Sequence, residues 1–591
     1  MEHVLEIESI AGGISPTAFD DSKDGYHAGL GIDPDMADNT ILRPGGIIKP
    51  IAYAEFSGAE VNVAPMWLRT TPKNELLYTL LANGKFISYS SALGSETLIA
   101  TATSCTGNGM VYYNNYIYIF RGVEVDRYGP IDGTPAYTTA IWTTATASNG
   151  FNQKAIQNRS YPQANQQALP NHVAHVHSDG ALYFCDVLPD GKGTIHKIKT
   201  APTLAYDGQT GAFTVGLTVT GGTSGATGVI LYDDDNGASG ILTLSNVIGT
   251  FADNETITDS STGSATVDGV LVQGGGNDGS SFNVLDLPND FWPTCLESWG
   301  NDLVIGALQS ATSGQPTRSP GNSSLFFWDT ISDSFYDEVK LKDPLTTALK
   351  NVNGLLYVTS GNGLTGCRVS VYAGGRQLTD EMYLDDVLPP YAGAVEALGD
   401  KFMFGTTTSY PNAFSVVYSF KSKDVRIKSQ LHCPIKTSGS GAAPFTGALL
   451  AFNQNAAFRG RLLVGWQDNS ASGIDQFGAA STLTSTFRKR WTIGREFHVS
   501  ELEVPFDSTV AANTSLTITL YADDLSSSQA LTAITNSTHP GNKVIVFKRP
   551  ELNLRGTNDL TVDMTWGLTN PIGVRLPVRV KIRTNEASRT R

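Results

Sequence analysis

The chain has 591 residues, too many for one ordinary hydrophobic core, so we expect either two to four domains or one large repeat body with additions. Hydrophobic residues make up 40% and charged residues only 16%, with 60 glycines and 27 prolines, a mixture that favours strands and turns over helical bundles. The formal charge of −15 argues against a protein that clamps nucleic acid by neutralising phosphates, because that mode requires clustered Lys and Arg.

The five cysteines are far apart in the sequence and include no CxxC pair. We interpret them as small buried hydrophobic residues in a reducing compartment: Cys105, Cys185, Cys295, Cys367 and Cys433. The opening MEHVLEIESIAGGIS lacks the basic and apolar regions of a secretory signal, and no stretch is apolar for long enough to span a membrane. We therefore expect synthesis in the cytoplasm and no membrane-spanning segment.

Residues 1–50 are rich in Gly, Pro and Asp and carry weak strand signal. This composition indicates an extended N-terminal arm, ordered by packing against its own body or against a neighbour.

One short phrase, a tight-turn pair followed by an apolar strand, recurs through the middle of the chain. The copies are NNYIYIFRG, DGALYFCD, NDLVIGA, NGLLYVTSGNG, GDKFMFGT and RGRLLVGW, aligned on Asn115, Gly180, Asp302, Gly354, Asp400 and Gly460, with a weaker NGKFISY after Gly84. Several intervals approach the ~40–50 residues of a four-stranded propeller blade once residues 201–275 are set aside. The first interval, from Gly84 to Asn115, is short for a blade.

A single blade cannot bury both faces of its sheet, so neighbouring blades must stack around an axis. The near-continuous apolar runs fit strands covered on both faces, and glycines after them, such as Gly306, would let strands crowd together. We predict an all-β chain with a six- or seven-bladed β-propeller, formed by residues 51–200 and 276–486. The alternative is a set of unrelated β-domains that share common β-hairpin sequences.

Residues 201–275 contain an internal duplication, FTVGLTVTGGTSGATGV from Phe213 and FADNETITDSSTGSATV from Phe251. The Thr/Val alternation and the Gly-Ser tracts predict a small inserted β-domain with tight turns. Such an insert is tolerated where its two ends meet in a surface loop, so we expect it to project from the propeller.

Residues 487–591 change to period-2 strands typical of a C-terminal β-sandwich. In LPVRVKIRT, Leu576, Val578, Val580 and Ile582 share one face, while Arg579, Lys581 and Arg583 share the other. LTVDMTW repeats the pattern with Leu560, Val562, Met564 and Trp566.

Three stretches contain residue types that could bind a cofactor or a metal ion. GNGLTG, with Gly361, Gly363 and Gly366, matches GxGxxG, but the strand-like CRVSVYAGG follows where a dinucleotide site needs a helix. HVAHVH places His172, His175 and His177 close together, either as metal ligands or as polar histidines of a strand edge or loop; only His175 and His177 share a strand face. YDDDNGASG, with Asp233, Asp234 and Asp235, could bind Ca²⁺ but lacks EF-hand spacing, so an acidic hairpin tip is the simpler interpretation.

No HExxH, P-loop or GxSxG motif is present, so we assign no catalytic, cofactor or metal residues and expect a protein that is not an enzyme. Local basic concentrations occur only in RGRLLVGW and FRKRW (Arg459, Arg461, Arg488, Lys489, Arg490). We interpret these as ion-pairing residues on the surface or between subunits rather than as nucleic-acid contacts.

Three stretches together resemble structural tail proteins of bacteriophages: the arm GGISPTAFDDSKDGYHAGLGIDPDMADNTILRPGGIIKP, the duplicated Gly-Thr segment, and the distal WTIGREFHVSELEVPFDSTVAANTSLTITLYADD. The resemblance implies a nozzle-like tail-tube protein of a short-tailed phage, located in the virion tail. In that family six copies form a ring below the portal and adaptor, DNA passes through the lumen, and fibres or spikes attach outside. No single binding residue carries over, because the motifs are loose. An acidic lumen would let DNA slide without sticking.

Two other classes stay open. A carbohydrate-binding or depolymerising tail protein would use propeller loops with aromatic side chains that stack on sugars; Trp292, Trp299 and Trp328 are candidates, although such tryptophans often belong to the core. A sensor propeller of extracellular type is disfavoured by the missing signal and the odd number of cysteines.

Overall fold

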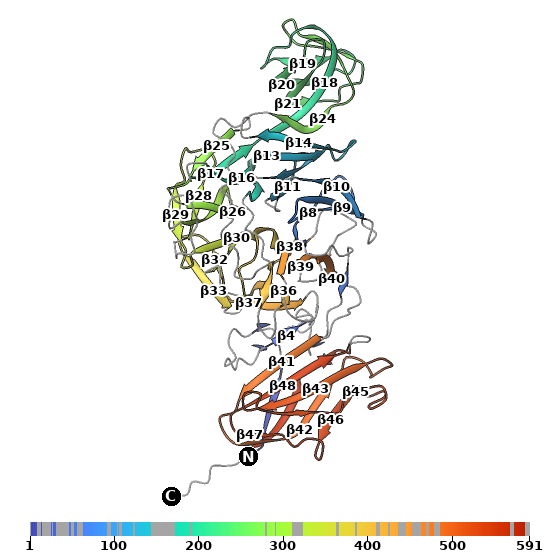
Figure 1. Ribbon diagram of the computed structural model, residues 1–591, viewed down its shortest axis with the longest axis vertical. Helices are drawn as coiled ribbons and strands as arrows, with labels where there is room; N and C mark the ends of the chain where they lie inside the picture. The colour runs from blue at the N-terminus through green and yellow to red at the C-terminus, as the bar shows by residue number, and fades with distance from the viewer. Residues whose placement is uncertain are drawn as a thin grey trace.

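The computed structural model describes residues 2–8, 13–14, 25–26, 28–30, 47–48, 53–55, 63–90, 96–102, 105, 109–121, 124–143, 172–188, 192–277, 281–289, 291–309, 323–361, 366–384, 387–408, 414–423, 426–434, 445–451, 462–467, 472–477, 485–567 and 572–584. In this part of the chain the regular elements are strands, apart from the short 3-10 helix η1 (Ala392–Ala394). The molecule is long, with a small β-body at one end, a wheel of sheets in the middle and a two-sheet body at the other end (Figure 1).

The wheel consists, in the described residues, of seven four-stranded antiparallel sheets. In order from the first sheet they are β7 (Pro65–Thr70), β8 (Leu76–Leu81), β9 (Lys85–Ser90) and β10 (Glu96–Thr101); β11 (Gly109–Tyr113), β12 (Tyr116–Phe120), β13 (Glu124–Gly129) and β14 (Ala136–Thr143); β15 (Ala174–Val176), β16 (Leu182–Val187), β17 (Gly193–Ile198) and β25 (Ser281–Asp286); β26 (Phe291–Trp299), β27 (Asp302–Gln309), β28 (Ser323–Trp328) and β29 (Asp337–Lys340); β30 (Leu345–Val352), β31 (Leu355–Gly361), β32 (Cys367–Tyr372) and β33 (Leu378–Leu384); β34 (Val395–Leu398), β35 (Lys401–Thr408), β36 (Phe414–Lys423) and β37 (Arg426–Pro434); β38 (Phe445–Ala451), β39 (Leu462–Gln467), β40 (Ser472–Phe477) and β6 (Tyr53–Glu55).

The first strands of the seven sheets contact one another in a closed cycle, β7 to β11, β15, β26, β30, β34, β38 and back to β7. This cycle makes the wheel a seven-bladed β-propeller, which confirms the fold class and decides between six and seven blades. The second strands are buried along nearly their whole length, as expected where neighbouring blades cover both faces. At Gly306 a Cβ atom would lie 2.5 Å from Cys295 Sγ and 3.0 Å from Thr346 of the next blade, so this position requires glycine.

The recurring phrase is the turn between the first and second strands of a blade. Asn114, Asn115, Gly180, Gly300, Asn353, Gly354 and Gly399 have the positive φ that such tight turns need. Gly84 differs, because it lies in the turn between β8 and β9, one strand later in its blade. The short interval from Gly84 to Asn115 therefore reflects two different turns rather than a small blade, and the alignment of that weaker copy was wrong. Gly460 itself lies outside the described residues, but the strand of that copy is β39, the second strand of the last blade.

The propeller is closed by the N-terminal part of the chain. Strand β6 pairs with β40, with Tyr53, Ala54 and Glu55 opposite Phe477, Gln476 and Asp475. The last blade thus combines strands that are more than four hundred positions apart in the sequence. Opening this blade requires the ladder hydrogen bonds between the two chain segments to break.

The inserted β-body emerges between the third and fourth strands of the third blade and lies at one end of the molecule (Figure 1). Its strands are β18 (Thr200–Gly211), β19 (Thr218–Gly221), β20 (Thr227–Asp235), β21 (Gly240–Ile248), β22 (Thr256–Thr258), β23 (Ser264–Val267) and β24 (Val272–Asn277). The sheet closes on itself because β18 pairs with both β21 and β23, and it encloses its own apolar core. Its two ends meet because β17 pairs with β25, with Lys197 opposite Ser281.

The body at the other end is a sandwich of two sheets. One contains β1 (Glu2–Ile7), β50 (Val578–Thr584), β42 (Phe497–Pro505) and β46 (Val544–Lys548), with β47 (Arg555–Gly556) beside β42; the other contains β4 (Ala28–Leu30), β41 (Ser485–Thr492), β48 (Asp559–Trp566), β43 (Ser515–Ala522) and β44 (Ser527–Ala530), with β45 (Ile534–Thr535) beside β43. The period-2 pattern is confirmed: Val578, Val580 and Ile582 are buried, and Arg579 and Arg583 are exposed.

The arm contributes more structure than its weak strand signal suggested. Strand β1 completes a sandwich sheet by pairing with β50, and β4 adds to the other sheet by pairing with β41. Short strands β5 (Ile47–Ile48) and β49 (Val574–Arg575) also pair, as do β2 (Gly13–Ile14) and β3 (Gly25–Tyr26). The signal was weak because β1 is an edge strand in which only Ile7 is fully buried.

Cys105, Cys185, Cys295 and Cys367 are free and buried, in agreement with their interpretation as core residues; the side chain of Cys433 lies outside the described part. A helix long and apolar enough to cross a membrane does not occur among the described residues.

Candidate functional site

Charged side chains gather near the propeller axis, at the mouth formed by the turns between first and second strands. Five innermost strands each contribute one: Arg69 from β7, His175 from β15, Glu297 from β26, Lys350 from β30 and Glu396 from β34. We call these five residues the axial cluster. Each lies near the end of its strand that leads into this turn, so the closed cycle of blades brings together residues that are remote in sequence.

Neighbouring blades are bridged within the axial cluster. Lys350 Nζ lies 2.9 Å from Glu396 Oε1, and His175 Nε2 lies 3.8 Å from Glu297 Oε1. Arg69 stands over the Trp67 ring and donates to the Leu68 carbonyl at 2.8 Å. The strand that carries Lys350 therefore lies between the strands that carry Glu297 and Glu396, and this arrangement of opposite charges favours the closed ring of blades.

The axial cluster shifts the acidity of its own members. Burial disfavours the charged form of Lys350, but Glu396 and Glu297 raise its pKa overall. Burial lowers the pKa of His175, against the opposing effect of Glu297 and with a smaller contribution from Lys350. Burial also lowers the pKa of Arg69, while Glu396 raises it. The charge of Arg69 thus acts on His175 and is acted on by Glu396, although one blade separates β7 from each of their strands.

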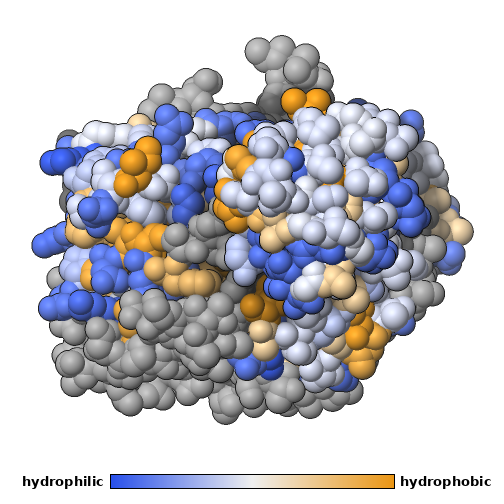
Figure 2. Space-filling view, turned by 90° about the horizontal axis from the view of Figure 1, so that it is seen from above, coloured by the Kyte–Doolittle hydropathy of each residue, from blue (hydrophilic) through white to orange (hydrophobic). Residues whose placement is uncertain are grey.

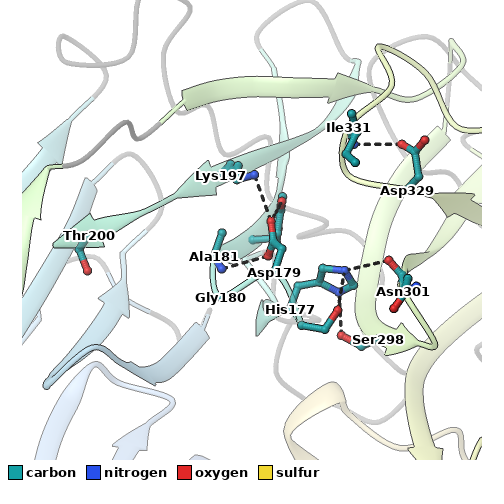
Figure 3. Close-up of polar contacts among 12 residues, drawn as sticks. His177, Asp179, Gly180, Ala181, Lys197, Thr200, Ser298, Asn301, Asp329 and Ile331 are labelled. Atoms are coloured by element: carbon teal, nitrogen blue, oxygen red, sulfur yellow. Dashed lines mark hydrogen bonds and ion pairs between the residues drawn. The ribbon is translucent and has the colours of Figure 1, made fainter. Parts of the chain in front are cut away.

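The three histidines of HVAHVH do not converge on one point. His172 is buried and donates from Nδ1 to the Cys185 carbonyl at 2.8 Å. His175 and His177 lie on the same side, as their spacing predicted, and both contact Ser298 Oγ, at 2.7 and 2.8 Å. His177 Nε2 is 3.1 Å from the Asn301 carbonyl, which can only accept, so Ser298 donates to His177 Nδ1 (Figure 3).

These contacts tie the turns of the third and fourth blades together. Asp179, beside His177, accepts from the Ala181 N–H at 3.0 Å and pairs with Lys197 Nζ at 3.1 Å (Figure 3). Across the described residues, no group of three or more His, Cys, Asp and Glu side chains is placed to hold a metal ion. A metal role for His172, His175 and His177 stays an untested hypothesis.

The sequence did not predict one buried His–Asp pair. His196 Nε2 donates to Asp186 Oδ2 at 3.0 Å, while His196 Nδ1 accepts from the Asn283 N–H at 3.0 Å. Burial lowers the pKa of His196 to about 3, so the imidazole is neutral and the contact is a hydrogen bond rather than an ion pair. His196 belongs to the phrase GTIHKI, which offers no sequence signal beyond an ordinary strand.

Asp233, Asp234 and Asp235 lie at the end of β20, at the tip of the β20–β21 hairpin of the insert. Asp233 accepts from the Tyr206 hydroxyl at 2.8 Å, and Asp235 accepts from the Gly237 N–H at 2.7 Å. Burial, together with the neighbouring Asp235 and Asp234 and against the Tyr206 hydrogen bond, raises the pKa of Asp233. A calcium role for these residues likewise stays untested.

The remaining candidates occupy structural positions. Gly366 is followed directly by strand β32, not by a helix; Gly363 lies outside the described residues. Trp292 and Trp328 are buried in the main core, whereas Trp299 is half-buried and donates to the Gly354 carbonyl at 2.9 Å. Two of the three tryptophans therefore cannot stack on a sugar.

The basic stretch FRKRW forms ion pairs within the sandwich. Arg488 pairs with Asp563, and Arg490 lies 3.0 Å from Asp559 and 3.2 Å from Asp524. Lys489 is buried. Arg459 and Arg461 lie outside the described residues.

Charge is unevenly distributed along the molecule. Between residues 200 and 277 the chain has no Lys, Arg or His but contains Asp207, Asp233, Asp234, Asp235, Asp253, Glu255, Asp259 and Asp268. Viewed from the end that carries the insert, exposed apolar residues form separate small patches among hydrophilic ones (Figure 2). The acidic insert and the sandwich lie at opposite ends of the long axis.

No family model matches the chain, and no curated protein matches it. Similar solved structures include the computationally designed Ika8 protein (12% identity, TM-score 0.33, covering 71% of this chain and 98% of that one) and the β-propeller domain of Myceliophteria thermophila Cps50 (Swd1) (10%, 0.34, 73% and 99%). The Neurospora crassa Pan2 WD40 domain is also similar (9%, 0.33, 72% and 95%). Similarities of this size carry no argument about function.

Proposed function

We propose that this protein is a structural subunit of a bacteriophage tail, of the nozzle type. Six copies would form a ring beneath the portal and adaptor, with fibres or spikes attached outside and a lumen through which DNA passes. The proposal starts from the resemblance of the arm, the duplicated insert and the distal sandwich to such proteins. It places the protein in the virion and gives it no catalytic role.

The observation that carries the proposal is the double use of the N-terminal segment. Strand β1 completes a sheet of the sandwich, and β6, fewer than sixty residues into the chain, completes the last propeller blade. A single segment therefore belongs to both the sandwich and the propeller, so a pull on one body acts on the hydrogen-bonded ladder of the other. Such a construction suits a part that must hold its shape while it carries neighbours.

The axial cluster supports the same role. Lys350 and Glu396 neutralise each other across adjacent blades, while His175, whose pKa burial lowers, contacts Glu297 as a neutral group. Such a pair favours closure of the ring of blades over binding of a ligand, because the two charges already neutralise each other. In this reading the propeller is a rigid spacer, and DNA would pass through the lumen of the ring rather than along the propeller axis.

The test is the assembly state of the full chain. Native mass spectrometry and negative-stain electron microscopy of the purified protein should show six-membered rings with a central opening. A fluorescent DNA duplex should pass a column of immobilised protein without retention, since the chain carries a formal charge of −15. A protein that stays monomeric at every concentration, or one that forms trimeric rods, would contradict the nozzle proposal.

The carbohydrate-binding or depolymerising alternative, through the propeller loops, has less support. Trp292 and Trp328 are core residues, which leaves Trp299 as the one tryptophan of the three with part of its surface free. Binding of the propeller mouth to a glycan array, abolished by Trp299→Ala, would favour this alternative over the nozzle.

A further inference from the structure

The sandwich has a half-open pocket of about 440 Å³ where β42 begins and β50 ends, beside β47. Three arginines, Arg549, Arg555 and Arg583, line it together with His498, Glu496 and Asp523. A pocket of this volume lies within the usual range for small-molecule sites, about 300–1,000 Å³.

Strand register brings the arginines together. On β42, His498 lies opposite Arg583 of β50 on one side and opposite Arg555 of β47 on the other. Arg549 completes the group, because its Nη2 lies 2.6 Å from His498 Nε2. Directly opposed residues in neighbouring strands lie about 5 Å apart at Cβ, so Arg555 and Arg583, on either side of His498, are about 10 Å apart and repel each other across the neutral imidazole.

In the described part of the chain, carboxylates of this sheet pair with Lys548, Arg579 and Lys581 but not with these three arginines. On the same strand as Arg583, Arg579 Nε lies 2.7 Å from Glu6 Oε1, and Lys581 Nζ lies 2.7 Å from Glu501 Oε1. Among the described residues no ion pair is formed by Arg549, Arg555 or Arg583, although Glu2 faces Arg583 in the register of β1. Burial lowers the pKa of His498, and Arg549, Arg555 and Arg583 lower it further, so the imidazole adds no charge of its own.

Repulsion of this kind is relieved by an anion in the pocket. The arginine guanidinium offers parallel N–H donors that match the two oxygens of a carboxylate or phosphate. Three arginines that share one pocket and form no ion pair among the described residues therefore point to an oxyanion ligand, in a chain whose formal charge is −15.

The acidic residues narrow the class of ligand. Asp523 is fixed by the Thr557 and Asn558 N–H groups, which donate to its Oδ1 at 2.7 Å each, and Glu496 stands beside it on the pocket wall. Two carboxylates would repel a polyanion but accept hydrogen bonds from hydroxyl groups. The pocket thus suits a molecule that combines one anionic group with several hydroxyls.

We propose that this pocket binds a sugar-sized molecule that carries a carboxylate or a phosphate group. The arginine row holds the anionic group, and Asp523 and Glu496 accept from ring hydroxyls. The proposal concerns the sandwich alone and stands whether or not the protein assembles into a ring.

Titration calorimetry and saturation-transfer NMR with the full-length protein test the proposal. The probes are glucuronate, glucose 6-phosphate, uncharged glucose, inorganic phosphate and the peptide YDDDNGASG. We expect glucuronate or glucose 6-phosphate to bind, with affinity that falls as salt is raised, and glucose to bind at least roughly tenfold more weakly, since hydrogen bonds to charged groups are the stronger ones. The carboxylate and phosphate arms show which oxyanion the pocket prefers.

Arg555→Gln and Arg583→Gln should each weaken binding roughly tenfold or more. The matched control is Arg579→Gln, which removes the same charge from β50 outside the pocket and should leave affinity unchanged. Unaltered thermal unfolding of each variant shows that the fold is intact. The proposal is overturned if neither acidic sugar binds, if the arginine variants bind like the control, if inorganic phosphate binds as tightly as both acidic sugars, or if the acidic peptide alone binds.

Discussion

Glu255 allows the contribution of one carboxylate to the insert to be worked out from its contacts. It is buried, and it accepts from the N–H groups of Thr223, Ser224 and Ala252 at 3.0, 2.8 and 2.7 Å, and from the Ser224 hydroxyl at 2.7 Å. Burial alone would raise its pKa, but the hydrogen bonds from Ser224, Ala252 and Thr223 outweigh burial and lower the pKa from 4.5 to about 2. The carboxylate thus joins the two turns of the duplicated segment.

The size of this effect follows from linkage. Each pKa unit corresponds to about 1.4 kcal/mol, so the lowering from 4.5 to about 2 sets an upper bound of roughly 3 kcal/mol. Because the turns lie at the surface of the insert and share solvent, about 1–2 kcal/mol is the expected contribution. A lowered pKa in the folded state means that the stabilisation is present above pH 4.5 and is lost as the pH falls through about 2.

We therefore expect Glu255→Gln to speed amide exchange of residues 221–226 and 252–256 by roughly tenfold, since an amide oxygen accepts these bonds more weakly. Hydrogen exchange followed by mass spectrometry measures this locally in the full chain. Asp268→Asn is the matched control: it makes the same charge change in the same insert at an exposed side chain. The difference between the two variants should persist at pH 5.

Equal exchange in the two variants would refute the reasoning, because Glu255 would then contribute no more than an exposed carboxylate. Loss of wild-type protection between pH 6 and pH 5 would refute it as well. Glu255 stays ionised over that range, so such a loss would assign the protection to another group.

Three further predictions concern the arm, the axis and the buried pair. In thermal melts, Ile7→Ala should destabilise the sandwich by about 2–5 kcal/mol. Val4→Ala, on the same strand at a side chain that is 51% exposed, should change stability by less than about 0.5 kcal/mol. Equal losses would show that β1 is not packed as described. Lys350→Met should lower stability by about 1–3 kcal/mol, because Glu396 then lacks its partner. The double variant Lys350→Met, Glu396→Leu should recover most of this stability. A double variant as unstable as the sum of the two single losses would contradict the pairing. The free energy of unfolding of the wild type should fall by up to roughly 1.4 kcal/mol per pH unit as the pH drops from 6.5 towards 3, because His196 binds a proton in the unfolded state but not in the folded state. Chemical denaturation of His196→Gln should show a smaller change of this free energy with pH. An unchanged dependence on pH would assign the effect to another group.

The propeller could be predicted because its signal is repeated. Each copy of the phrase places a turn residue such as Gly180 or Gly354 before a strand buried on both faces, and six such copies identify a wheel. The closing strand could not be found in the same way, because Tyr53–Glu55 is three residues long and gains its role only from β40.

The candidate sites were harder to predict because sequence proximity is a poor guide to contact in this fold. His172, His175 and His177 are neighbours in the chain, yet His172 points to Cys185 and the other two to Ser298. The axial cluster and the arginine pocket are assembled from residues far apart in the chain. Their positions follow from blade order and strand register, which no local motif encodes.

The uneven charge bears on how copies can be arranged. Within one molecule the acidic insert and the arginine pocket lie at opposite ends and cannot meet. In a ring whose subunits share one direction, inserts lie level with inserts, and each brings carboxylates such as Asp268 and no cation. Their mutual repulsion, strongest within about 10 Å at moderate salt, keeps neighbouring inserts apart, so contacts between subunits must come from the propeller, the arm or the sandwich. A head-to-tail filament would instead place an acidic insert against an arginine pocket and would weaken as salt is added, whereas a ring held by those other surfaces would not.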